Sequence, residues 1–116
     1  MNLLTTKQND IFLIEVNIPR TSIYLANEFK ELIFDAIDSG EKYFIVDFSK
    51  CEFIDSTFLG VLVVSYKRLI PVGGNIHLVI KNQNIVANLE MTRMNKIFQI
   101  FPTVEEASKN LLHTNI

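Results

Sequence analysis

The chain has 116 residues, enough for one compact domain, so we expect residues 1–116 to fold as a single unit. With 48% hydrophobic and 21% charged residues it is too apolar for a disordered protein, and its net charge of −2 without a Lys/Arg cluster excludes a typical nucleic-acid binder. The longest apolar run, Phe58 to Val64, is far shorter than the roughly 20 residues that span a bilayer, and residues 1–10 lack a secretory signal pattern. We therefore expect a cytoplasmic protein without membrane insertion.

The first third of the chain predicts a hairpin followed by an amphipathic helix. Residues 2–7 and 11–16 have strand composition, with a turn at residues 8–10 between them. Pro19 closes the second strand, and the hydroxyl of Thr21 or Ser22 can cap the helix that follows. The helix is predicted by apolar residues that recur at spacings of three and four, namely Leu25, Phe29, Leu32, Ile33 and Ala36.

The middle of the chain predicts a buried strand and then a buried helix. Residues 43–48 are nearly all apolar, which is typical of a strand covered on both faces of a sheet. Residues 58–70 are too long and too apolar for a strand and end at Pro71, so we expect a largely buried helix. A Gly73-Gly74 turn then leads to a strand at residues 76–80.

The last third predicts a short helix at residues 83–91, a strand at 97–100 and a final helix. Thr103 and Glu106 have the spacing of a capping box at the start of that helix. The order of elements predicts an α/β fold: a mostly parallel central sheet of about five strands with four helices, and the N-terminal strand antiparallel at the edge.

Three small polar residues, Asp55, Ser56 and Thr57, stand between the central strand and the apolar helix. In parallel α/β sheets, ligands collect where the carboxyl end of a strand turns into a helix. The same residue types are favoured as helix caps, so a purely capping role stays open. Because a helix start has unpaired N–H groups and about half a positive charge, it would also accommodate a phosphate on Ser56.

The segment from Phe53 to Val79, FIDSTFLGVLVVSYKRLIPVGGNIHLV, resembles the centre of STAS domains (sulfate transporter and anti-sigma factor antagonist), especially the small bacterial anti-sigma factor antagonists. Residues 95–107, NKIFQIFPTVEEA, are similar to the closing strand and helix of that family. The positions that match the family pattern in the first segment are Asp55, Ser56, Thr57, Leu59, Gly60, Gly73 and Gly74.

The resemblance implies a regulatory phosphoprotein rather than an enzyme, without cofactor or metal. An anti-sigma factor that is also a GHKL-type serine kinase would phosphorylate Ser56, and a PP2C-type phosphatase would reverse this. The unphosphorylated chain would bind the kinase and release a sigma factor, which regulates transcription. An alternative is a STAS scaffold subunit of a stressosome-like complex or an accessory subunit of a lipid-transport ABC ATPase.

Two places depart from the family pattern. Family members usually have Gly at the position of Phe58, where an aromatic ring either packs in the core or stands out as a partner contact; we favour the contact. Where the family commonly has Gly-Glu-Ile/Leu-Asp, this chain has Pro19-Arg20-Thr21-Ser22. We therefore expect Arg20 and Ser22 at the partner-binding surface.

The expected partner-binding residues thus form a group around the phosphoacceptor Ser56, namely Asp55, Thr57, Phe58, Arg20 and Ser22. Arg20 is either a solvated loop charge or a partner for the phosphate in a charge-assisted pair.

Two other reactive side chains are His77, in a predicted strand, and Cys51, in the loop before the motif. A lone His on a strand is usually structural, and no Gly-x-Ser-x-Gly elbow surrounds Ser56, so a hydrolase triad with Asp55 is a weak alternative. One Cys cannot form an internal disulfide or a zinc site; it is either a small buried residue or an exposed redox-sensitive thiol.

Overall fold

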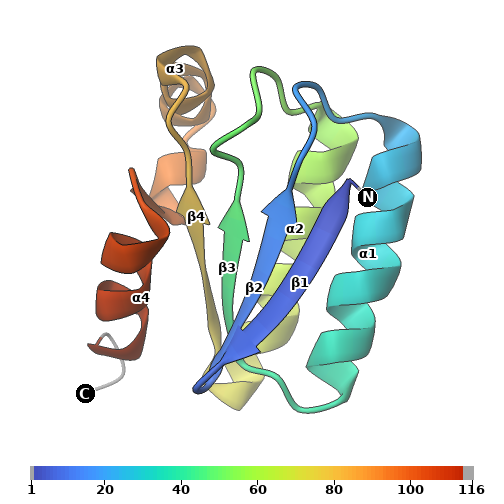
Figure 1. The fold of residues 1–116 in the computed structure, drawn as a ribbon, viewed down its shortest axis with the longest axis vertical. Helices are drawn as coiled ribbons and strands as arrows, with labels where there is room; N and C mark the ends of the chain where they lie inside the picture. The colour runs from blue at the N-terminus through green and yellow to red at the C-terminus, as the bar shows by residue number, and fades with distance from the viewer. Residues whose placement is uncertain (1, 114–116) are drawn as a thin grey trace.

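The computed structural model describes residues 2–113 and shows a five-stranded sheet with helices on both faces (Figure 1). The strand order is β1-β2-β3-β4-β5, with β1 antiparallel to β2 and the other neighbours parallel. The predicted fold class is therefore confirmed. The strands are β1 (Leu3–Gln8), β2 (Ile11–Val16), β3 (Tyr43–Asp47), β4 (Asn75–Val79) and β5 (Gln99–Phe101).

Helices cover the two faces of the sheet unequally, as Figure 1 shows. On one face, α1 and α2 pack against a core that includes Ile14 and Val46. On the other face, α4 packs its Ala107 and Leu111 against Ile45. The helices are α1 (Ile23–Asp38), α2 (Ser56–Leu69), α3 (Gln83–Met91) and α4 (Val104–His113), with short 3-10 turns η1 (Ile70–Val72) and η2 (Met94–Lys96).

The parallel arrangement of β2, β3 and β4 brings their carboxyl ends to one rim of the sheet. The loops after these strands, at residues 17–22, 48–55 and 80–82, therefore gather at this rim, and α3 lies beside it (Figure 1). The opposite rim carries the β1–β2 hairpin turn, in which Asn9 adopts a left-handed φ of 57°. The motif that the sequence singles out lies at the carboxyl-end rim.

Most predicted elements lie within two residues of the observed ones. Residues 83–91 form α3 as predicted, and Thr103 caps α4 by accepting the N–H of Glu106 at 3.1 Å. The last strand begins later than predicted, because residues 94–96 form η2 and Phe98 turns into the core.

Candidate functional site

The motif lies where the loop after β3 leads into α2. The helix begins at Ser56, and Asp55 is its N-cap residue with an extended backbone (φ −76°, ψ 162°). Behind them, α2 turns Phe58, Leu62 and Leu69 into the core. The buried face of α2 thus anchors the helix, and its first turn holds the polar residues of the motif at the surface. The prediction of a largely buried helix is wrong, because the outer side of α2, with Gly60, Val64, Lys67 and Arg68, is exposed.

Both carboxylate oxygens of Asp55 are occupied. Oδ2 accepts the backbone N–H groups of Thr57 and Phe58 at 3.2 and 3.4 Å, which satisfies two donors of the first turn. Oδ1 accepts a hydrogen bond from the hydroxyl of Thr21. That hydroxyl oxygen also accepts the backbone N–H of Asp55 at 2.8 Å. The capping role that the residue types favour is confirmed for Asp55.

Ser56 and Thr57 are the exposed residues of the motif. Ser56 occupies the first helical position, and among the described residues its hydroxyl has no hydrogen-bond partner. Thr57 is held by its backbone N–H, which donates to Asp55, while its side chain is free to face solvent. The Ser56 hydroxyl is therefore accessible for modification and does not hold the fold together.

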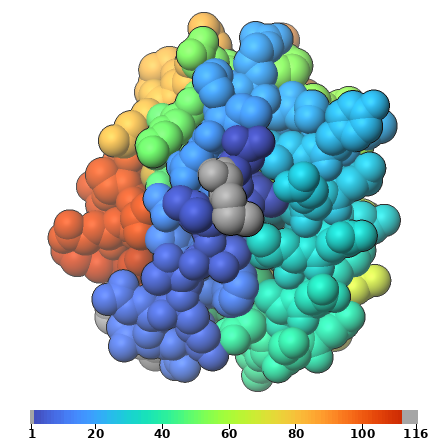
Figure 2. Space-filling model, turned by 45° about the vertical axis from the view of Figure 1, so that its right-hand side comes forward, coloured from blue at the N-terminus to red at the C-terminus, as the bar shows by residue number. Residues whose placement is uncertain are grey.

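The loop after β2 is bound to the segment that precedes the motif. The carbonyl oxygen of Pro19 accepts the N–H groups of Glu52 at 2.6 Å and Phe53 at 3.1 Å, and the N–H of Thr21 donates to the carbonyl oxygen of Phe53 at 3.1 Å. Arg20 and Phe53 form a short parallel bridge. Figure 2 shows the two segments, one blue and one green, side by side at the top of the molecule. They form one continuous surface.

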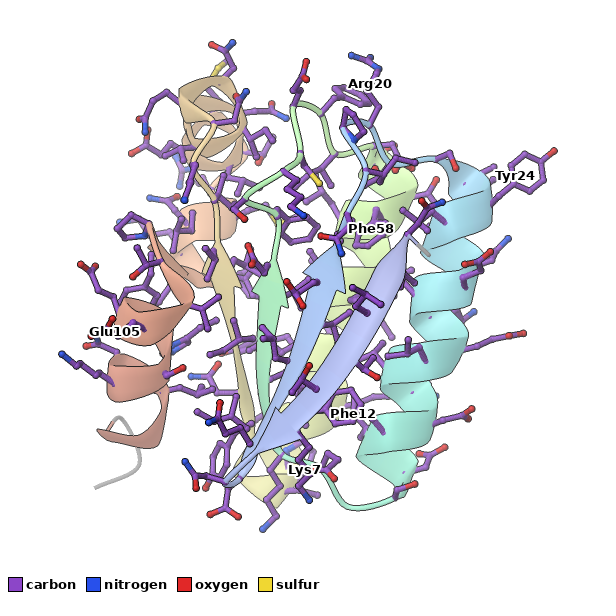
Figure 3. The ribbon with its side chains drawn as sticks, in the orientation of Figure 1. Lys7, Phe12, Arg20, Tyr24, Phe58 and Glu105 are labelled. Atoms are coloured by element: carbon purple, nitrogen blue, oxygen red, sulfur yellow. The ribbon has the colours of Figure 1, made fainter. Side chains whose placement is uncertain are left out.

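The sequence predicts Arg20 and Ser22 at the partner surface. In the structure the side chain of each contacts a residue other than Ser56. The guanidinium of Arg20 lies over the ring of Phe53, 4.5 Å from its centroid, and Figure 3 shows Arg20 at the top of the molecule. Ser22 caps α1 by accepting the N–H of Leu25 at 3.3 Å. Both residues are exposed. A pair between Arg20 and a phosphate on Ser56 stays a prediction.

Phe58 is fully buried, so the preference for a ring that stands out as a partner contact is wrong. Its ring stacks on Phe29 with centroids 4.5 Å apart and meets the edge of Phe48 at 5.6 Å. The reason is helical phase: Phe58 lies four residues before Leu62 and shares its inward face. Figure 3 shows the side chain inside the molecule, behind the strands. The core-packing alternative describes this residue.

Thr21 is a site residue that the sequence analysis missed. The sequence analysis names Thr21 only as a possible cap for α1. The side chain is 6% exposed and is bound to Asp55, 34 residues away in the chain. No local pattern signals a pairing at that separation. Ile23 and Tyr24, in the first turn of α1, are exposed apolar residues that the sequence analysis did not single out, with 56% and 80% exposure.

A groove of about 320 Å³ borders the motif between α2 and α3. Side chains at its buried floor are apolar, and those at its exposed rim are mostly polar. The floor residues are Ile54, Leu59, Ile85 and Leu89, and the rim residues are Glu52, Phe53, Asn84 and Asn88. Ile54 and Leu59 flank the motif, but none of residues 55–57 lines the groove.

His77 is buried beneath α4, on the sheet face opposite α2. Its Nδ1 lies 3.3 Å from the carbonyl oxygen of Ala107, and its buried Nε2 has no hydrogen-bond partner in the described part of the chain. Burial lowers the pKa of this imidazole. Asp55 and Ser56 lie at the start of α2, so the three residues do not form a triad.

Cys51 is buried in the loop before the motif, and its thiol lies 3.7 Å from the carbonyl oxygen of Val16. Burial raises the pKa of the thiol to about 12, with a smaller contribution from Asp47. This favours the small buried residue over the exposed redox thiol. Within residues 2–113, no three or more His, Cys, Asp or Glu side chains are grouped as for a metal ion, and no helix could cross a membrane.

The family model of the STAS domain matches residues 2–107. The chain belongs to the STAS domain family. This STAS domain is 35% identical over 83 residues to a Thermotoga neapolitana protein named as an anti-sigma factor antagonist, which covers 71% of this chain and 74% of that protein.

Solved structures of the family share the fold. A Thermotoga maritima protein named as an anti-sigma factor antagonist superposes with a TM-score of 0.85 at 28% identity, covering 94% of this chain and 93% of that one. The Bacillus anti-sigma factor antagonist SpoIIAA, in its unphosphorylated form, has a TM-score of 0.76 at 15% identity and covers 96% of this chain and 97% of its own. The names of these relatives describe regulators of anti-sigma factors.

Proposed function

We propose that this STAS domain is an anti-sigma factor antagonist in the cytoplasm whose binding is switched by phosphorylation of Ser56. The observation that carries the proposal is the exposed hydroxyl of Ser56 at the first position of α2, which has no hydrogen-bond partner among the described residues. The names of the relatives support the role, and SpoIIAA has been solved in phosphorylated and unphosphorylated forms.

A phosphate on Ser56 would change the surface without unfolding the domain. It adds about 1.5 to 2 negative charges, which takes the net charge of the chain from −2 to near −4. The positive end of the α2 dipole offsets part of this charge, by roughly 0.3–1 kcal/mol. The fold loses no hydrogen bond of the Ser56 hydroxyl, because none is formed with the described residues. The effect is therefore concentrated on whatever docks at the rim.

The proposed partner is an anti-sigma factor of the GHKL serine-kinase type, and a PP2C-type phosphatase would restore the serine. The docking surface would include the exposed residues around Ser56, namely Arg20, Ser22 and Thr57, with Asp55 as the cap beneath them. Like charges brought together across an interface cost several kcal/mol, and each 1.4 kcal/mol is a tenfold change in affinity. One phosphate is sufficient to dissociate a complex of moderate affinity.

The test is phosphorylation of the purified chain by a GHKL-type anti-sigma factor from the same genome with ATP, followed by peptide mass spectrometry. We expect one phosphate on Ser56, none in Ser56→Ala, and native modification in the matched variant Thr6→Ala, which removes an exposed hydroxyl on β1 away from the docking surface. Calorimetry should then show binding of the unphosphorylated chain and at least tenfold weaker binding of the phosphorylated chain.

Modification at another residue, or equal affinity of both forms, contradicts the proposal. Stable co-purification with a transporter ATPase or a megadalton particle would instead favour a scaffold subunit.

A further inference from the structure

The hydroxyl of Thr21 forms two hydrogen bonds with the same residue, Asp55. It accepts the backbone N–H of Asp55 at 2.8 Å and donates to Oδ1 of the same residue. The side chain is only 6% exposed, so water competes little for either bond. The position of the Asp55 carboxylate is therefore fixed from the side opposite its helix-capping oxygen.

The direct neighbour of this carboxylate in the chain is the phosphoacceptor of the proposed switch. With Thr21 on Oδ1 and the N–H groups of Thr57 and Phe58 on Oδ2, Asp55 has its hydrogen-bond needs met without the Ser56 hydroxyl. Removal of the Thr21 hydroxyl would leave Oδ1 without this donor. We expect the hydroxyl of Ser56, the next residue in the chain, to donate to the carboxylate in its place.

We propose that Thr21 is a positioning residue for phosphoryl transfer to Ser56: it holds Asp55 in its capping position and so leaves the Ser56 hydroxyl unbonded and presented to the kinase. This inference rests on the proposed function. In the transfer, Ser56 Oγ forms a bond to the γ-phosphorus of ATP while the bond from that phosphorus to the bridging oxygen of ADP breaks. The hydroxyl proton passes to a base of the kinase.

Three variants separate positioning from stability. Thr21→Val removes the hydroxyl at nearly constant shape, and Thr21→Ser keeps the hydroxyl. Ser65→Ala is the matched control, because it removes a buried hydroxyl from α2 that donates only to the carbonyl oxygen of Val61 at 2.8 Å. A thermal melt of each variant sets a temperature at which all are folded.

The first measurement is the steady-state rate of Ser56 phosphorylation by the GHKL-type kinase. In Thr21→Val we expect kcat to fall on the order of ten- to a hundredfold, because the acceptor oxygen is misplaced, while KM stays near native. Thr21→Ser and Ser65→Ala should keep native kcat. A native kcat in Thr21→Val, or a fall in Thr21→Ser as large as in Thr21→Val, overturns the inference.

The second measurement needs no kinase. Phosphoserine is incorporated at position 56 during synthesis, and its phosphate is titrated by phosphorus NMR in the native, Thr21→Val and Thr21→Ser backgrounds. Loss of the Thr21 donor leaves more of the Asp55 charge unbalanced, so we expect the pKa of the phosphate to rise in Thr21→Val alone. A fall in kcat without this shift would assign Thr21 to the fold and overturn the inference.

Failure of the proposed function has a different signature. In that case the native chain itself would carry no phosphate on Ser56, whereas failure of the Thr21 inference leaves native phosphorylation intact.

Discussion

The ring of Phe58 lies on the ring of Phe29, with centroids 4.5 Å apart and planes inclined by 23°. Phe29 belongs to α1 and Phe58 to the first turn of α2, and both side chains are fully buried. The pair therefore joins the two helices directly below the motif. The aromatic residue at this unusual position supports the site from inside.

Phe58→Ala should destabilise the domain by about 3–5 kcal/mol, because it leaves a cavity between α1 and α2. Urea unfolding measures this loss. Phe53→Ala is the control at the surface: its ring is 41% exposed, and we expect a loss near 1 kcal/mol or less, mainly of its contact with Arg20. A Phe58→Ala protein of native stability would contradict the supporting role of this ring pair.

Asp55→Ala should destabilise the domain more than Ser22→Ala. Both changes remove an N-cap, which is worth roughly 0.5–2 kcal/mol, but only Asp55 also accepts a hydrogen bond from the buried Thr21 hydroxyl. Asp55→Asn retains an oxygen that can cap and should lose less than Asp55→Ala. Chemical denaturation at pH 7 compares the three. Equal losses in Asp55→Ala and Ser22→Ala would show that the link to Thr21 adds no stability.

His77 should make stability depend on pH below its ordinary pKa. Burial lowers the pKa of the folded imidazole below 6.5, so the unfolded chain takes up a proton first as the pH falls. The free energy of unfolding is therefore highest above about pH 6.5 and decreases as the pH falls below it. The decrease ends where the pH reaches the pKa of His77 in the folded protein. His77→Leu should flatten this part of a series of urea titrations from pH 7 to 5. The same pH dependence of the free energy of unfolding in the native protein and in His77→Leu would show that His77 is not its source.

The thiol of Cys51 should resist alkylation while the domain is folded. Its burial and its pKa of about 12 leave almost no thiolate at pH 8. Reaction with an aromatic disulfide reagent should therefore be slow in buffer and fast in urea. Val16→Ala, which loosens the strand next to the thiol, should speed the reaction in buffer, whereas the surface change Lys50→Ala should not. Rapid reaction of the native protein would indicate an accessible thiol.

The glycines Gly60 and Gly74 should respond oppositely to alanine. A Cβ at Gly74 would lie 2.5 Å from the carbonyl oxygen of Lys42 and 2.8 Å from Leu69 Cδ2, so Gly74→Ala should lower the melting temperature by several degrees. A Cβ at Gly60 meets nothing within 4 Å, and Gly60→Ala in the exposed side of α2 should stabilise by roughly 0.5–1 kcal/mol. If both variants shift the melting temperature in the same direction, the close approach at Gly74 is contradicted.

Apolar patterning predicted most of this fold, because α1 buries one face and the central residues of β3 are buried on both faces of the sheet. The apolar spacing from Leu25 to Ala36 identified α1, and the turn residues at 8–10 identified the hairpin. β5 was less accurate, since its bounds depend on pairing with β4 (Val79 opposite Phe101) and not on its own apolar residues.

The position of the site followed from the sequence, but its internal contacts did not. Asp55 and Ser56 stand between a strand and a helix, which local pattern can show. Whether Phe58 points inward depends on the phase of α2 relative to Phe29, and the Thr21–Asp55 pair depends on two loops meeting across the sheet rim. Both are consequences of tertiary packing.

The β1–β2 hairpin turn lies at the far end of β2 from the motif, a strand length of roughly 20 Å away. Because the native thiol is buried, a cysteine introduced by Asp10→Cys in this exposed turn would be the preferred target of a maleimide dye. A single substitution thus gives the domain an attachment point for a fluorescent reporter that could follow partner exchange at the other rim without obstructing it.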